Sequence, residues 1–438
     1  LATVPFLAIF GALTLSNWAL LCMVIVIAAL AVISIFYRKN LPAAFFPVAI
    51  AVIAISLIFH RELITTNLLG WDTFGEYHVF KLADMNSLWQ PYLNFNQSEL
   101  RDYNAMLSVT VLPTIYSKLM NIPGEWIFKS LYFVLYAFVP LAMYEMYKHN
   151  FGRATAFLAA FYFITFPRFF GEERRQIIGE LFLVLILFTI LSSSINFKKK
   201  EPLIAIFGIA LIVSHYSTFY VFMFCALFAW MALILLEKLS IIKKPLEIKK
   251  VLTARVLLIL LAVGVFWYVF ISTSLDQTFI AFIDRLSLSF TSGFVDVGSR
   301  GGTVSEFISP NFANMTITGQ IDYFVSKIPY LLIAVGTVAL IKNRKKMNIQ
   351  AEYLPITVAA IAILLMTFIL PALADSFIEA RFFHLLLIFL APIGFYGGII
   401  AFTWIAKHYT SLNKARSYAI CILCILFVAI FMFKVGFV

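Results

Sequence analysis

Long apolar segments constrain this chain more than any other feature of its sequence. They recur along its whole length, and many approach the roughly 20 residues that a helix needs to cross about 30 Å of hydrocarbon. Charged residues make up 13% of the chain, whereas a soluble domain has about 25%. The sequence therefore predicts an all-α polytopic membrane protein.

Thirteen segments are candidates for membrane-spanning helices, and we expect about eleven to thirteen of them to cross. Those at 1–14, 202–213 and 328–341 are short for a crossing. Since no repeat and no low-complexity linker divides the chain, we predict a single membrane domain over 1–438, in which 1–40 supply extra N-terminal spans. The segments are 1–14, 18–36, 41–59, 130–147, 154–169, 177–194, 202–213, 218–236, 252–273, 328–341, 353–370, 382–404 and 416–437.

Basic residues are distributed unevenly among the connections between these segments. Alternate connections together hold 20 of the 33 Lys and Arg residues but 5 of the 22 Asp and Glu residues. The positive-inside rule places such connections in the cytoplasm, and it places the long segments 62–129 and 274–327 outside the cell membrane. The sequons at Asn96 and Asn314 fall in these two segments. The net charge of +11 therefore indicates topology and not a nucleic-acid partner.

The two outer segments differ in character. Segment 62–129 alternates apolar and polar residues and predicts short helices in the membrane interface, with aromatic anchors such as Phe80 and Trp89. Segment 274–327 begins with an amphipathic stretch and continues through closely spaced glycines, which predict a flexible lid at 293–303.

Two acidic residues open the first outer segment, in the sequence Gly70-Trp71-Asp72-Thr73-Phe74-Gly75-Glu76. Asp72 and Glu76 would share one face of a helix, since positions i and i+4 are neighbours. A carboxylate at the membrane edge can take a proton from an attacking hydroxyl. These two residues are therefore the catalytic candidates, with Asp72 as the base.

Further ionisable residues cluster at the outer ends of later spans. Arginine offers a rigid fork of donors that matches phosphate oxygens, so these clusters favour a shared polar cavity for a lipid-linked phosphate. Each cluster alone has an alternative interpretation as a solvated loop. The clusters are a charged turn with Arg168, Glu172, Glu173, Arg174, Arg175, Gln176 and Glu180, a break at His215 and Tyr216, and a late group of Glu379, Arg381 and His384.

These residues together predict transfer of a sugar from a polyprenyl-phosphate-linked donor to a glycan, lipid or protein acceptor on the outer face. Membrane lipids are the other expected partners. The sequence does not decide whether a divalent cation takes part. The expected substrate-binding residues are Arg174, Arg175, His215, Tyr216, Glu379 and Arg381.

The same pattern resembles the GT-C membrane glycosyltransferases, which include protein mannosyltransferases, the oligosaccharyltransferase catalytic subunit and lipid-A aminoarabinose transferase. Asp72 matches their acidic first-loop position, and the resemblance implies that it is the base of an inverting transfer. Arg381 matches a late arginine near the donor phosphate. The chain departs from the pattern because Glu76 lies four residues beyond Asp72, where GT-C motifs have two acids adjacent or one apart.

Other stretches look like an uncharacterised archaeal family of multi-spanning proteins, which implies no specific function. They are 71–81, 103–110, 176–182 and 214–216.

Two further functions stay open. A transporter or lipid flippase would have broken helices with charges near the middle of the membrane and two similar halves. A non-catalytic membrane scaffold is the third hypothesis. Cys421-x-x-Cys424 lies inside an apolar run, so we interpret it as packing and not as a zinc or redox site.

Overall fold

A computed structural model of the chain describes residues 1–91, 98–167, 169, 173–238, 248–271, 284, 287, 310–343, 350, 352–369 and 379–435. Across these residues the secondary structure is helical, with no β-strand, which confirms the predicted fold class.

Eight of the described helices are long and apolar enough to cross a membrane. Among them, the segment Gly124–Phe151 is continuous through four consecutive elements, α7 (Gly124–Trp126), η1 (Ile127–Leu131), α8 (Tyr132–Tyr136) and α9 (Phe138–Phe151). The other seven are α2 (Asn17–Phe36), α3 (Phe45–Glu62), α13 (Tyr216–Lys238), α15 with η3 (Ala254–Val265 and Phe266–Ile271), α18 (Ile317–Asn343), α21 (Glu379–Ala406) and α22 (Leu412–Lys434).

The remaining five predicted spans are also helices, but they are shorter or more polar. α10 lies inside the bundle, with every residue from Thr155 to Thr165 buried, so its length is matched to protein neighbours and not to lipid. The five are α1 (Thr3–Thr14), α10 (Arg153–Thr165), α11 (Arg174–Leu191), α12 (Phe197–Ser214) and α19 (Tyr353–Ile369). The short helix α14 (Ile248–Val251) precedes α15. The predicted topology assigns it to the cytoplasmic side.

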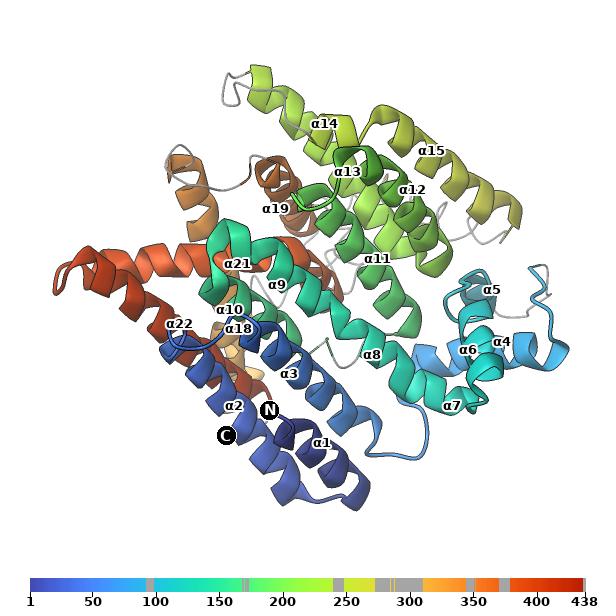
Figure 1. Ribbon diagram of the computed structural model, residues 1–438, viewed down its shortest axis with the longest axis horizontal. Helices are drawn as coiled ribbons and strands as arrows, with labels where there is room; N and C mark the ends of the chain where they lie inside the picture. Colours follow the sequence, from blue (N-terminus) through green and yellow to red (C-terminus); the bar gives the residue numbers. More distant parts are fainter. Residues whose placement is uncertain are drawn as a thin grey trace.

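Glycines set the closest helix crossing in the bundle. A Cβ atom on Gly336 of α18 would lie 2.0 Å from the carbonyl oxygen of Ile393 on α21, and one on Gly397 would lie 2.3 Å from the Gly336 nitrogen. Small residues at such positions let two backbones touch, as is common between membrane helices. α2 packs against α22, which also contacts α21, so the N-terminal helices lie against the C-terminal one (Figure 1).

The first outer segment folds into the predicted short helices, which lie together at one end of the molecule (Figure 1). Of the two named anchors, the structure contradicts the prediction for Phe80. Phe80 is buried in the core and Trp89 stacks on Trp267, whereas Trp71 is 88% exposed and Phe74 is also exposed. The reason is the helical period, which turns Phe80 to the same inward face as Glu76. The helices are α4 (Trp71–Asn86), α5 (Ser98–Asn104), α6 (Val111–Met120) and α7.

The second outer segment is described at 284, 287 and 310–327, so the predicted lid at 293–303 lies outside the described residues. α18 begins at Ile317, well before the predicted start of its span at 328. The early polar turns of α18 are stabilised by an ion pair between Asp322 and Lys434 at the end of α22. Asn314 belongs to the short 3₁₀ helix η5 (Phe312–Asn314), and Asn96 lies outside the described residues.

Polar contacts between the helix connections fall into two groups. One group joins connections that the charge distribution assigns to the cytoplasm, and the other joins connections that it assigns to the outer face. The first group is Arg38–Ser417, Asn150–Gln350 and Glu201–Arg255, and the second is Ser108–Ser214, Ala105–Trp267 and Asp322–Lys434.

Candidate functional site

The charged turn predicted at 168–180 is largely a helix. α11 begins at Arg174, so Arg174, Arg175 and Gln176 lie in its first turn and Glu180 lies in its second. All four side chains are buried, which excludes the interpretation of this cluster as a solvated loop. The two cluster residues outside the described part of the chain are Arg168 and Glu172.

The carboxylate of Glu76 stabilises the start of α11. It accepts hydrogen bonds from the backbone N–H of Arg174 at 3.1 Å and of Arg175 at 3.4 Å. The first N–H groups of a helix have no partner inside the helix, and the positive end of the helix dipole favours an anion there. A side chain from α4 thus caps α11, which the sequence could not show.

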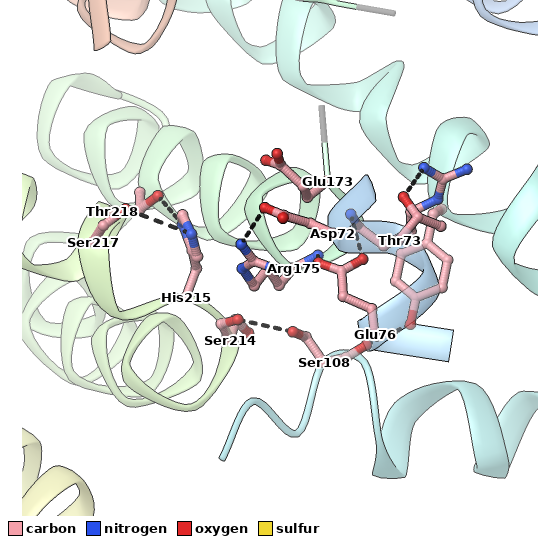
Figure 2. Close-up of polar contacts among 12 residues, drawn as sticks. Asp72, Thr73, Glu76, Ser108, Glu173, Arg175, Ser214, His215, Ser217 and Thr218 are labelled. Atoms are coloured by element: carbon pink, nitrogen blue, oxygen red, sulfur yellow. Dashed lines mark hydrogen bonds and ion pairs between the residues drawn. The ribbon is translucent and has the colours of Figure 1, made fainter. Parts of the chain in front are cut away.

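Arg175 lies between the two predicted catalytic carboxylates (Figure 2). Its Nη2 donates to Asp72 Oδ2 at 2.9 Å, and its Nη1 donates to Glu76 Oε1 at 2.9 Å. The Arg175 guanidinium also lies 4.4 Å from the centre of the Tyr103 ring, and its Nε is buried without a hydrogen-bond partner. The predictions that Asp72 and Glu76 share a face and that Asp72 lies near an arginine are confirmed.

The two carboxyl groups are held in different electrostatic environments. Burial raises the pKa of Asp72, but the attraction of Arg175 and hydrogen bonds from Arg175 and Tyr103 outweigh burial and hold this pKa below its ordinary value. Burial raises the pKa of Glu76 to about 7, against the opposing attraction of Arg175. Asp72 is 26% exposed at its side chain and Glu76 is fully buried, so only Asp72 of the two can reach a ligand.

Arg174 faces the other way and is fully engaged by the protein. Its Nη2 donates to Glu62 at 2.6 Å, its Nη1 donates to Thr73 at 2.8 Å and to the Leu69 carbonyl at 3.2 Å, and its Nε donates to the Phe128 carbonyl at 3.1 Å. These contacts tie α3, α4 and η1 to the start of α11. They favour a structural role for this arginine over the predicted substrate contact.

The late arginine joins the cluster through Glu173. The Arg381 guanidinium pairs with Glu173 Oε1, while Glu173 Oε2 is buried without a hydrogen-bond partner. Glu379 begins α21, but its side chain lies outside the described part. His384 is buried one turn further along α21, where it stacks on Phe163, with 4.2 Å between ring centres.

His215 and Tyr216 lie at the break between α12 and α13, as predicted. The His215 ring is buried and directed to Thr218, with 2.6 Å between Nδ1 and the Thr218 hydroxyl (Figure 2). Burial lowers the pKa of His215 well below its ordinary value, so the ring is neutral. A Cβ on Gly179 of α11 would lie 2.8 Å from His215 Cβ, which brings this break against α11.

Two functional candidates on α5 were missed by sequence reasoning. Tyr103 donates to Asp72 and stacks under Arg175, and its neighbour Asp102 interacts electrostatically with Arg175. Both lie thirty residues from Asp72 in a stretch without a recognisable motif. The sequence signal for Tyr103 was the likeness of 103–110 to the archaeal family, and this stretch does not include Asp102.

α5 is fixed to the rest of the fold by its C-terminal end. Trp89 Nε1 donates to the Asn104 carbonyl at 2.9 Å, and Trp267 Nε1 donates to the Ala105 carbonyl at 3.2 Å. Leu107 N then donates to the Val213 carbonyl at 2.8 Å, next to the α12–α13 break. These contacts hold the end of α5 against the segment after α4, against η3 and beside the break between α12 and α13.

Metal ligands do not gather in the described part of the chain, where no group of three or more His, Cys, Asp or Glu side chains is placed to hold an ion. All four cysteines are free, and Cys424 packs in the core of α22, which agrees with the packing interpretation of Cys421-x-x-Cys424.

This fold and this buried ionic cluster define a multi-spanning α-helical membrane protein with a polar site at the ends of its helices. The chain belongs to the family of predicted membrane proteins DUF2206, whose sequence profile matches residues 200–438. The matched part includes His215, Tyr216 and Arg381, while Asp72 and Arg175 precede it. No curated protein matches the sequence.

Proposed function

We propose that this protein is a membrane glycosyltransferase of the GT-C type, which moves a sugar from a polyprenyl-phosphate-linked donor to an acceptor on the outer face. The observation that carries the proposal is the position of Arg175. This buried arginine is held between two carboxylates by a helix that lies beside Arg381, at the predicted outer ends of the spans.

Arg175 and Arg381 are suited to hold the donor phosphate. An arginine carries five N–H donors, and Arg175 uses one from Nη1 and one from Nη2 on the carboxylates, so other donors including Nε have no partner. Arg175 is 4% exposed, so a phosphate oxygen would reach these donors only after neighbouring side chains move. Arg381 pairs with Glu173, the residue directly before α11, so the two arginines belong to one connected cluster. Positive charge fixed there would stabilise the negative charge that develops on the leaving phosphate.

A first-loop carboxylate would take the proton of the attacking hydroxyl. The sequence predicts Asp72 for this role, and its partly exposed carboxylate beside Arg175 supports the prediction. Glu76 would act indirectly, because it is buried and holds both Arg175 and the start of α11. Arg174 would likewise position α11 and not contact the donor.

The two groups of polar contacts agree with the predicted topology, because each group joins connections that the charge distribution assigns to a single face. Asp72, Arg175, Tyr216 and Arg381 come from four connections that the charge distribution assigns to the outer face, and they converge. The other group of contacts joins connections that are rich in Lys and Arg. One example is the hydrogen bond from Arg38 to Ser417. An outer site at the membrane edge suits a donor whose lipid tail stays in the bilayer.

The test separates catalysis from donor binding. Purified protein in lipid nanodiscs is given a polyprenyl-phosphate hexose as donor and an alkyl glucoside as acceptor. Asp72→Asn should lower turnover by about 10²–10⁴-fold while donor binding is kept, because it removes the proton acceptor. Arg381→Gln should instead weaken donor binding by about tenfold or more, since a charge-assisted phosphate contact is lost.

Matched controls use the same changes away from the cluster. Asp84→Asn removes a carboxylate of α4 that pairs with Lys118, and Arg255→Gln removes an exposed arginine that pairs with Glu201. Both should behave as wild type. Two results together would contradict the proposed function. The wild-type protein would bind the donor with no higher affinity than it binds free polyprenol, and it would never release polyprenyl phosphate.

A further inference from the structure

Large apolar side chains are exposed on the short helices of the first outer segment. Leu119 is 80% exposed and Met85 is 78% exposed, and six others are 46–88% exposed. Apolar surface gathered in this way marks a site of contact with a membrane or a protein. We call it the outer apolar surface, and its members are Trp71, Phe74, Met85, Leu88, Ile115, Leu119, Met120 and Trp126.

This surface passes from α4 to α6. Phe74 and Met85 lie on the same side of α4, because they are eleven residues apart, or about three helical turns. Asp84 of α4 pairs with Lys118 of α6 at 3.0 Å. Met85 and Leu119 directly follow these two residues, so the ion pair brings the exposed apolar residues of the two helices together.

α4 is also bound to the ends of two membrane-spanning helices. The Arg174 guanidinium donates both to Glu62 at the end of α3 and to Thr73 in the first turn of α4. One turn further along α4, Tyr77 donates to Glu125 at 3.0 Å. Glu125 belongs to α7, where the long span from α7 to α9 begins. These bonds hold α4 at the level where the spans leave the membrane.

Trp126 connects the outer apolar surface with the lipid-facing side of that span. Trp126 is 50% exposed in α7, and Val134 and Phe138 are exposed further along the same continuous segment. Exposed apolar residues of a membrane-spanning helix contact lipid, and tryptophan is enriched at the level of the headgroups. The outer apolar surface is therefore continuous with a surface that lipid covers.

We propose that the outer apolar surface is embedded in the membrane leaflet at the outer ends of the spans, so that lipid is its partner. Lys81 is exposed on the same side of α4 as Phe74, and its long side chain can extend to the lipid phosphates. These residues take the place of the anchors that the sequence predicts. The inference concerns where the short helices lie, and it does not depend on sugar transfer.

α4 then joins the lipid to the buried ionic cluster. The side of α4 opposite Phe74 carries Thr73 and Glu76, which are buried and bonded to the start of α11. A helix with its side chains is about 10–12 Å across. Lipid contact on one side of α4 therefore fixes how deep the cluster lies relative to the headgroups.

The experiment measures the depth of nitroxide spin labels in phosphatidylcholine nanodiscs. Phe74→Cys, Leu119→Cys and Trp126→Cys are each made in a variant whose four native cysteines, all free, are replaced by alanine. Power-saturation EPR compares collisions of the label with oxygen, which concentrates in hydrocarbon, and with a water-soluble nickel chelate. At all three positions, collisions with oxygen should exceed collisions with the chelate.

Val134→Cys and Thr66→Cys are the matched references. Val134 is exposed on a span, and Thr66 is an exposed polar residue of the connection between α3 and α4. Oxygen should dominate at Val134 and the chelate at Thr66. If the three test positions behave as Thr66 does, the surface faces water and the inference is wrong. If they are shielded from both reagents, a second copy or another protein covers the surface, which also overturns the inference.

Discussion

At the scale of single residues, two adjacent arginines have different roles, one in the packing of helices and one in the candidate site. Arg174 is 2% exposed and directs its guanidinium to Glu62 and to the backbone of neighbouring segments. Arg175 points to the opposite side and meets the carboxylates of the cluster. Successive helix residues are turned by about 100°, so a single residue separates a structural ion pair from the site.

Removing Arg174 should therefore destabilise the protein more than it changes the site. Arg174→Met leaves the Glu62 carboxylate buried without its partner, and such a loss costs about 3–5 kcal/mol. Chemical denaturation in detergent, followed by tryptophan fluorescence, measures the free energy of unfolding. Arg255→Met is the control, because its guanidinium is 75% exposed and its ion pair is worth about 1 kcal/mol or less. Equal stabilities for the two variants would show that the Arg174 contacts are not structural.

At the scale of elements, the site depends on how closely α5 approaches α4. Gly75 lies between Asp72 and Glu76 in sequence, and a Cβ atom there would be 2.4 Å from the Tyr103 ring. This ring in turn supports Arg175 and donates to Asp72. A glycine in the middle of a helix usually lowers stability, so its presence in α4 has a packing reason here.

Gly75→Ala should move the Tyr103 ring and loosen α5 without unfolding the bundle. Helix propensity favours alanine by about 1 kcal/mol, which offsets part of the steric cost. We expect turnover to fall at least tenfold while the melting temperature changes little. Gly319→Ala is the control, because its nearest neighbour is the Thr316 hydroxyl at 3.3 Å. Full activity of Gly75→Ala would mean that the Tyr103 contact is dispensable.

The elements themselves were largely predictable, whereas their polar contacts were not. Apolar run length located a helix in each of the thirteen predicted segments, and eight of these helices are long and apolar enough to cross a membrane. The start of α11 was misjudged because it is stabilised by Glu76, about a hundred residues earlier, and not by a local capping residue. The contact of Tyr103 could not be seen, since nothing near it in the sequence reveals that the Arg175 guanidinium lies over its ring.

At the scale of the whole molecule, the fold gathers four distant connections at one set of helix ends. The charge distribution alone assigned these connections to one face, and their side chains meet there as Asp72, Arg175, Tyr216 and Arg381. The charges of the cluster lie at helix ends, whereas a transport pathway requires charges in mid-span. The arrangement favours an enzyme whose substrate is bound partly by the protein and partly by the membrane.

The central claim is that this cluster binds the phosphate of a lipid-linked sugar. Its most direct test is a cryo-electron microscopy structure of the wild-type protein in nanodiscs with a polyprenyl phosphonate C-glycoside, which cannot be cleaved. We predict that the phosphonate lies within hydrogen-bond distance of Arg175 or Arg381, with its tail running between helices into the bilayer. A phosphonate bound at the opposite, Lys- and Arg-rich ends of the helices, with the Arg175 cluster unchanged, would contradict the account.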